Sequence, residues 1–150
     1  MSAAAVGVDV RGPLAAIDPG RSKCGLVLTD AHQQRVVEAC VLPPEASWER
    51  LKAWHQQTAL VGVVLGDGTS SGPWQTRLAE LCPLLLIDER GTTLAARERF
   101  WQLEPPRGWR RLVPKGLRLP PRDWDDVVAQ LLLERHLGRL LQRIRTLREP

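Results

Sequence analysis

The sequence predicts an α/β fold in which helices cover both faces of a mixed five-stranded sheet, with three antiparallel strands and two parallel ones. Two observations lead to this expectation. Three short apolar runs near the N-terminus follow one another across polar turns, as the strands of an antiparallel meander do. Two later apolar runs alternate with helical patterns, which is typical of parallel strands joined by crossover helices. A chain of 150 residues is long enough for one such domain.

The antiparallel part of the sheet is expected near the N-terminus. Its three strands are predicted at residues 14–17, 25–28 and 36–42. The first strand ends at Asp18, and polar segments rich in turn formers separate each strand from the next. Pro43 ends the third strand, because proline has no amide hydrogen for the strand ladder.

Helices and parallel strands are expected to alternate after this meander. Ser47 is a candidate cap for a first helix with tryptophans on its inward face, and Pro73 can open a second helix. Continuous apolar runs at residues 60–65 and 84–87 are typical of strands that are covered on both faces.

The last two predicted helices flank a segment that cannot form a regular element. A third helix is predicted from Thr92 or Thr93 to about residue 103, and a fourth from Asp123, with an apolar stripe that reaches Leu147. Residues 104–122 between them contain five prolines and two glycines. We term this Pro/Arg-rich segment the basic loop, because basic side chains interleave there with a tryptophan and leucines. These basic residues are Arg107, Arg110, Arg111, Lys115, Arg118 and Arg122.

Positive charge is concentrated in the second half of the chain. Residues 1–89 hold 7 basic and 10 acidic side chains, whereas residues 90–150 hold 14 and 7, so the net charge of +4 is the sum of −3 in the first part and +7 in the second. Only three of the 21 basic residues are lysines, and the planar guanidinium of arginine matches phosphate geometry. The basic half is therefore a candidate nucleic-acid surface, although a solvated basic helix would have the same composition.

The composition and the cysteine pattern indicate the environment in which the protein is expected. No apolar run approaches the ~20 residues of a membrane span, so we expect no membrane partner. The three cysteines form no Cys-x-x-Cys pair, which argues against structural zinc and suits a cytoplasmic location. Residues 1–12 are expected to form a flexible leader, and residues 13–150 a single domain.

Carboxylates stand at three places that an α/β fold can bring to one crevice. Asp18 ends the first strand, and Asp88 and Glu89 end the last one. Asp125 and Asp126 open the last helix. Carboxylates gathered in one place repel one another and resist ionisation unless a divalent cation neutralises them. Oxygen ligands suit Mg²⁺ or Mn²⁺, which can activate water for phosphodiester cleavage.

Most of these residues also have an ordinary structural interpretation. Acidic residues complement the dipole in the first turn of a helix, and an Asp between a strand and a glycine is a common turn former. Asp88 and Arg90 could pair locally, and Asp67, after the fourth predicted strand, is either a turn residue or an extra ligand. Trp109 could stack on a base or could pin the basic loop. The residues alone leave these alternatives open.

Three motifs occur in an order that is found in a known family. Residues 17–25 read Ile-Asp-Pro-Gly-Arg-Ser-Lys-Cys-Gly, residues 88–96 read Asp-Glu-Arg-Gly-Thr-Thr-Leu-Ala-Ala, and residues 125–129 read Asp-Asp-Val-Val-Ala. These segments resemble the Asp-x-Gly strand, the Asp-Glu-Arg-x-Thr-Thr segment and the closing Asp-x-x-x-Ala helix of the RuvC/YqgF group of RNase H-like nucleases. The chain departs from that pattern at residues 65–69, where a Gly-Leu-Pro-like segment is expected, and in the length of the basic loop.

The resemblance implies an RNase H-like fold and a metal-dependent nuclease site. Carried over by motif, the Mg²⁺ or Mn²⁺ ligands would be Asp18, Asp88 and Asp125, with Glu89, Asp126 and Asp67 as candidate additional ligands. Members of the group are linked to the resolution of branched DNA or to the maturation of pre-16S ribosomal RNA, and the closer likeness is to the second, YqgF-like branch. The expected nucleic-acid contacts are Arg21, Lys23, Arg90, Arg107, Trp109, Arg110, Arg111, Lys115 and Arg118.

The alternative to a nuclease is a non-catalytic nucleic-acid-binding or assembly module that keeps the same fold. A homodimer is a further expectation for resolvase-type action, because a junction with two-fold symmetry calls for two equivalent subunits.

Overall fold

A six-stranded mixed sheet forms the centre of the computed structural model, which describes residues 11–68 and 70–144. The strands are β1 (Leu14–Asp18), β2 (Cys24–Thr29), β3 (Arg35–Leu42), β4 (Gly62–Gly66), β5 (Leu84–Ile87) and β6 (Gln142–Arg143). They lie in the order β5-β4-β1-β2-β3-β6. β2 is antiparallel to β1 and to β3, whereas β4 is parallel to β1 and β5, and β6 is parallel to β3.

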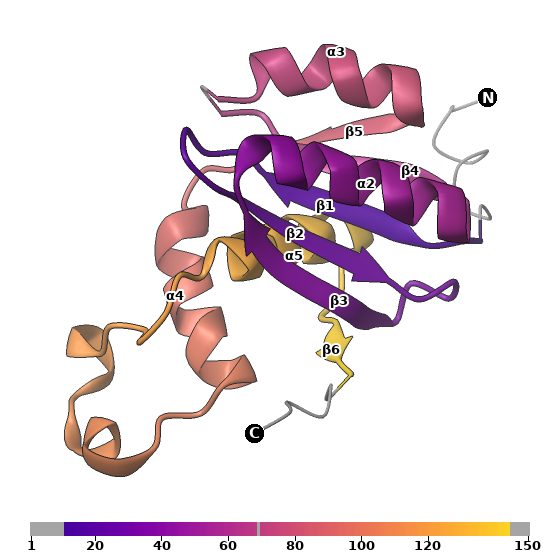
Figure 1. Cartoon of the computed structure of the whole chain (residues 1–150). Helices are drawn as coiled ribbons and strands as arrows, with labels where there is room; N and C mark the ends of the chain where they lie inside the picture. The colour runs from indigo at the N-terminus through magenta and orange to yellow at the C-terminus, as the bar shows by residue number, and fades with distance from the viewer. Residues whose placement is uncertain (1–10, 69, 145–150) are drawn as a thin grey trace.

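Helices cover both faces of this sheet, as the sequence predicts (Figure 1). They are α2 (Pro44–Thr58), α3 (Gly72–Leu81), α4 (Thr92–Leu103) and α5 (Asp125–Leu137). α2 and α3 lie on one face, where Trp54 and Leu78 join the buried cluster around Ile17. α5 lies on the opposite face and contributes Leu132 to a second cluster. α4 packs against α5 through a third cluster that contains Phe100.

The sixth strand corrects the expected number of five, and it shortens the last helix. α5 ends at Leu137 because Gly138 adopts a left-handed φ of 71°, which stops a helix. The chain then turns back, buries Leu141 and pairs β6 with the start of β3. The predicted helical stripe is therefore wrong beyond Gly138, and Leu147 lies outside the described residues.

One helix begins earlier than predicted, whereas α4 begins at Thr92, one of the two positions expected to open it. α2 begins at Pro44 rather than after Ser47, because proline fits the first turn of a helix, where its missing amide hydrogen costs nothing. The Ser47 hydroxyl is buried and donates a hydrogen bond of 2.9 Å to the Pro43 carbonyl. α4 is preceded by Gly91 with a φ of 72°, and the Thr92 hydroxyl donates to the Glu89 carbonyl at 2.6 Å.

Other expectations concern the ends of the chain and its surroundings. Residues 1–10 of the expected leader lie outside the described residues. Within the described parts of the chain, none of the helices has the length and apolar character needed to cross a membrane. Cys24, Cys40 and Cys82 are free thiols.

Candidate active site

A cleft of about 310 Å³ opens beside the C-terminal ends of β1 and β5 and the first turn of α5. A smaller hollow of about 130 Å³ lies on the β4 side. Asp18 and Glu89 line both spaces, and Asp125 lines the larger one. Carboxylates from three separate segments of the chain therefore face one region. The other residues around the larger cleft are Lys23, Thr92, Thr93, Asp123, Trp124 and Val128.

Asp125 reaches this region because β2 has a glycine where α5 crosses it. In the antiparallel register, Asp18 lies opposite Gly25. A Cβ atom on Gly25 would lie 1.8 Å from the carbonyl oxygen of Asp125, so only glycine lets the first turn of α5 contact the strand. The second glycine of the first motif therefore sets the position of the carboxylate in the third motif.

Glu89 reaches the cleft across the end of β4, where two glycines leave room for its side chain. A Cβ atom on Gly68 would lie 1.6 Å from Glu89 Oε1, and one on Gly66 would lie 2.6 Å from Oε2. Asp67 Oδ1 accepts a hydrogen bond of 3.2 Å from the backbone N–H of Glu89. Residues 66–68, where the chain departs from the family pattern, thus leave room for the Glu89 side chain. The Asp67 carboxylate here holds the backbone of Glu89 in place.

Asp88 lies outside the cleft, although the family resemblance implied that it would complete the metal site with Asp18 and Asp125. Its side chain is 54% exposed and its Oδ2 lies 3.0 Å from Arg90 Nε. The backbone N–H of Arg90 donates to Asp88 Oδ1 at 2.9 Å, and chiefly for this reason the pKa of Asp88 is lowered. The structure therefore brings Glu89, and not Asp88, together with Asp18 and Asp125.

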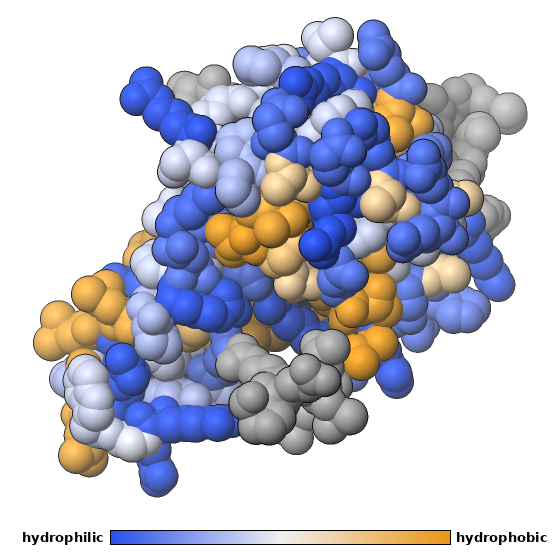
Figure 2. Space-filling model, viewed as in Figure 1, coloured by the Kyte–Doolittle hydropathy of each residue, from blue (hydrophilic) through white to orange (hydrophobic). Residues whose placement is uncertain are grey.

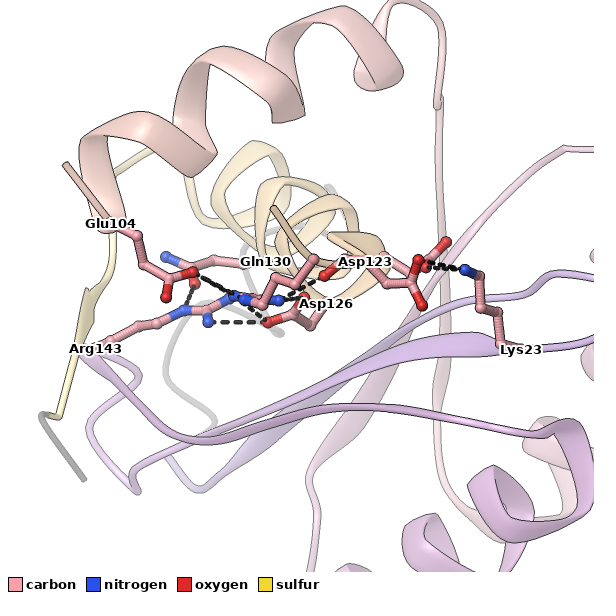
Figure 3. A network of polar contacts seen from close by, with 8 residues as sticks. Lys23, Glu104, Asp123, Asp126, Gln130 and Arg143 are labelled. Carbon is pink, nitrogen blue, oxygen red and sulfur yellow. Dashed lines mark hydrogen bonds and ion pairs between the residues drawn. The ribbon is translucent and has the colours of Figure 1, made fainter. Parts of the chain in front are cut away.

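Asp126 also lies away from the cleft, in a buried ionic network. Only 3% of the residue is exposed, and its two carboxylate oxygens each lie 2.9 Å from an arginine, Oδ1 from Arg122 and Oδ2 from Arg143. Arg143 also donates a hydrogen bond to Gln130 Oε1 at 2.7 Å. Figure 3 shows Arg143 on the far side of Asp126 from Lys23 and Asp123. The contacts of Asp126 are therefore structural.

The electrostatics of the cleft are those of crowded carboxylates. Burial raises the pKa of Asp18 to about 7, and the negative charges of Asp125 and Glu89 contribute to the same shift. Burial also raises the pKa of Asp125, against the opposing effect of Lys23. The Lys23 ammonium lies 2.6 Å from Asp123 and 3.9 Å from Asp125, so one cation partly balances this acidic edge.

Sequence reasoning missed Asp123, Thr92 and Thr93 as residues of the cleft. Asp123 stands two positions before Asp125, and its pairing with Lys23 brings it to the cleft rim. The available signal was the cluster of three acids at residues 123–126, at a predicted helix start. The two threonines lie at the start of α4, where the first turn of a helix commonly faces a ligand site.

The side chains expected to contact nucleic acid differ in their exposure and in the partners that they have within the protein. Arg21, Arg107, Arg111 and Lys115 are exposed. Lys23 and Arg90 pair with neighbouring carboxylates. The guanidinium of Arg110 lies 4.8 Å from the centre of the Trp109 ring. Arg118 instead folds the basic loop, because its guanidinium donates hydrogen bonds to loop carbonyls.

The donor chemistry of the cleft fits a hard divalent cation. Within residues 11–68 and 70–144, no three His, Cys, Asp or Glu side chains stand as a group ready to hold a metal ion. Mg²⁺, however, usually keeps several waters and uses one or two protein carboxylates together with substrate phosphates. Asp18, Glu89 and Asp125 are oxygen donors whose mutual repulsion a cation would relieve. They fit Mg²⁺ or Mn²⁺ in that open form.

Fold and site together define an α/β protein with an acidic cleft beside the C-terminal ends of β1 and β5. No protein-family model and no curated protein sequence matches the chain. Among solved structures it is similar to RuvC of T. thermophilus in complex with a Holliday junction substrate, with a TM-score of 0.51, 16% identity, and coverage of 84% of this chain and 96% of that one. A second Thermus thermophilus RuvC structure has a TM-score of 0.48, 15% identity and the same coverages. The first likeness confirms the predicted RNase H-like fold.

Proposed function

We propose that this protein is a metal-dependent nuclease that hydrolyses phosphodiester bonds in structured nucleic acid. The observation that carries the proposal is the convergence of Asp18, Glu89 and Asp125 on one cleft, where the pKa of Asp18 is raised to about 7. A carboxylate in a structural ion pair would have a lowered pKa instead. Carboxylates that are held close against their repulsion are typical of functional sites, and a cation removes that repulsion.

The residues of the cleft have separable roles in this proposal. Asp18, Glu89 and Asp125 would hold Mg²⁺ or Mn²⁺, so we assign to Glu89 the role that the sequence suggested for Asp88. When bound, the ion would supply Lewis-acid stabilisation of the phosphate and activate the attacking water. Lys23, on the same cleft, would offset the negative charge that a phosphate brings. The basic loop would bind the backbone largely without reading sequence.

Two substrate classes are candidates within this function. The resemblance of residues 88–96 to the YqgF-like segment supports processing of pre-16S ribosomal RNA. The likeness to RuvC, whose structure contains a Holliday junction substrate, supports the resolution of branched DNA. Junction resolution would also require a homodimer, which light scattering of the purified protein would detect.

The test is a cleavage assay on structured RNA and on branched DNA, with Mg²⁺ or Mn²⁺ titrated into the wild type and into Asp18→Asn. We expect metal-dependent cleavage that falls by about 100-fold or more in Asp18→Asn, because a ligand of the ion is lost. Glu80→Gln, on the exposed surface of α3, is the matched control and should cleave like the wild type. Undiminished cleavage by Asp18→Asn would overturn the site, and tight binding without cleavage by any of these proteins would identify a non-catalytic module.

A further inference from the structure

The basic loop exposes large apolar side chains on a segment that projects from the body of the protein. In Figure 1 the chain between α4 and α5 extends away from the sheet, and Figure 2 shows hydrophobic atoms along it. Trp109, Leu112, Leu117 and Leu119 have exposed fractions between 67% and 87%. Such a concentration of exposed apolar residues on one segment indicates an interaction surface.

The loop is held in shape by its own hydrogen bonds. Two short 3₁₀ turns, η1 (Gly108–Leu112) and η2 (Lys115–Leu117), form its tip. Arg118 Nε donates to the carbonyls of Arg110 at 3.0 Å and Val113 at 2.7 Å, and thereby ties the two turns together. The apolar side chains are thus displayed on a folded element, which reduces the entropy lost when a partner binds.

The two ends of the loop are joined by an ionic network at the first turn of α5. Arg122, at its C-terminal end, lies 2.6 Å from Glu104 at its N-terminal end and 2.9 Å from Asp126 in α5. Figure 3 shows Glu104, Asp126 and Arg143 within this network. Because Asp126 directly follows Asp125, the network fixes the base of the loop to the helical turn that carries a cleft carboxylate.

The charge of the loop selects a polyanionic partner. Between Glu104 and Arg122 the sequence has five basic residues and no acidic one. Arg107, Arg111 and Lys115 are exposed. These cations suit phosphates, but the base faces of a continuous duplex are stacked on one another and offer a stacking side chain no free surface. Aromatic and aliphatic side chains instead stack on unpaired bases or insert between loosened base steps.

We propose that the basic loop is a stacking surface for unpaired or unstacked bases near the phosphate held in the cleft. Trp109, with the Arg110 guanidinium over its ring, is the stacking platform, and Leu112 and Leu117 are the apolar wedge. The inference rests on the proposed nuclease function and specifies its substrate class, a nucleic acid with unpaired bases close to the site of cleavage.

The spacing along α4 supports this assignment. Thr93, at the start of α4, lines the cleft, and Arg97 of the same helix donates a hydrogen bond of 3.4 Å to the carbonyl of Gly116 in η2. Four residues of an α-helix correspond to about 6 Å along its axis. The length of the Arg97 side chain adds to this rise, so the loop lies several nucleotide steps of about 3.4 Å each from the cleft. Bases a few nucleotides away from a phosphate in the cleft are therefore the ones that the loop would contact.

The experiment compares binding of two fluorescent oligonucleotides by anisotropy, in Ca²⁺ to prevent turnover. One is a continuous duplex, and the other is the same duplex with a central run of unpaired bases. The variants are Trp109→Ala and the double substitution Leu112→Ala with Leu117→Ala. Leu140→Ala, an exposed leucine after α5, is the matched control. Circular dichroism and the thermal midpoint establish that every variant is folded.

We expect the wild type and Leu140→Ala to bind the unpaired-base duplex about 10-fold more tightly than the continuous one, because stacking contributes to each contacted base. Both loop variants should lose this preference and keep their affinity for the continuous duplex. An unchanged preference in both loop variants would overturn the inference and leave the nuclease proposal standing. If the wild type binds neither oligonucleotide, the proposed function itself is wrong. A third outcome would also overturn the inference. In it, the wild type shows no preference for unpaired bases but binds anionic phospholipid vesicles, and both loop variants lose this vesicle binding. The surface would then be assigned to a membrane.

Discussion

At the scale of single residues, folding makes ionisation of the Asp18 carboxylate unfavourable. Its ordinary pKa is 3.8, and burial next to Asp125 and Glu89 raises that pKa to about 7 in the folded protein. At intermediate pH the folded protein keeps a proton that the unfolded chain has released. The free energy of unfolding therefore falls as the pH rises between these two values, and the lost stability stays lost above the upper one.

Asp18→Asn should consequently stabilise the metal-free protein at high pH and have little effect at low pH. The gain near about pH 8 is at most about 4 kcal/mol, and it should nearly vanish near about pH 4, because Asp18 is then protonated in the folded state and Asn carries no charge at any pH. Urea unfolding of both proteins at both pH values, with a chelator present, measures this difference in the free energy of unfolding. A stabilisation that is equal at both pH values, or a loss of stability at the higher one, would contradict the raised pKa.

Residue identity within the site could be predicted only in part. Asp18 and Asp125 stand in recognisable sequence surroundings, and the structure places both at the cleft. Asp88 and Glu89 are neighbours at the end of β5, and side chains of consecutive residues near a strand end face different ways. Which of the two enters the cleft depends on the room above Gly66 and Gly68, a contact between distant segments that no local pattern contains.

At the scale of elements, the approach of α5 to β2 depends on one glycine. In Gly25→Ala the added methyl group would overlap the backbone of Asp125, so α5 must shift or the fold must lose stability. We expect a destabilisation of about 3 kcal/mol or more, together with weaker metal binding. Gly72→Ala, where nothing lies within 4 Å of an added Cβ, is the control and should be nearly neutral in urea unfolding. Equal stability of the two variants would contradict the close packing.

The buried network around Asp126 should stabilise the junction of α4, α5 and β6. Asp126→Asn removes the charge that Arg143 pairs with and leaves Arg122 with Glu104 alone, and we expect a loss of about 3 kcal/mol. Asp123→Asn breaks an exposed pair with Lys23, which solvent screens, and should have a much smaller effect on stability. Chemical denaturation of both variants checks the contrast. A loss that is as large for Asp123→Asn as for Asp126→Asn would show that burial of the network is unimportant.

Elements with a regular period were predictable, whereas those shaped by single contacts were not. Apolar runs and helical stripes located β1–β5 and α2–α5 close to their observed positions. β6 has two residues and exists because Gly138 ends α5, so it leaves no periodic signal. The fold of the basic loop is set by carbonyl contacts of the Arg118 side chain, which composition does not reveal.

At the scale of the whole molecule, two unlike charge distributions meet at the first turn of α5. The acidic cleft includes Asp125, and the basic loop ends at Arg122, three residues before it. A polyanion on the loop would therefore approach carboxylates that need a cation to tolerate a phosphate. Under the proposed function, we therefore expect nucleic-acid binding to depend on salt and cleavage to depend on a divalent ion.

Replacing Arg111 and Lys115 together by glutamine should weaken nucleic-acid binding in a salt-dependent way. Each lost phosphate contact lowers the slope of log affinity against log salt by about 0.9 for duplex DNA, so the double variant should lose about 2. Arg77→Gln, in α3, removes an arginine that pairs with Glu45 and should leave the slope unchanged. Affinities measured over a series of NaCl concentrations test this, and an unaltered slope in the double variant would place the phosphate contacts elsewhere.

The central claim is that Asp18, Glu89 and Asp125 form a divalent-cation site, and calorimetric titration with Mn²⁺ tests it most directly. The comparison is between the wild type, Glu89→Gln and Asp88→Asn, two neighbouring substitutions that remove the same charge. We predict that Glu89→Gln weakens Mn²⁺ binding by about 10-fold or more, while Asp88→Asn binds Mn²⁺ as the wild type does. Loss of binding in Asp88→Asn with normal binding in Glu89→Gln would contradict this prediction.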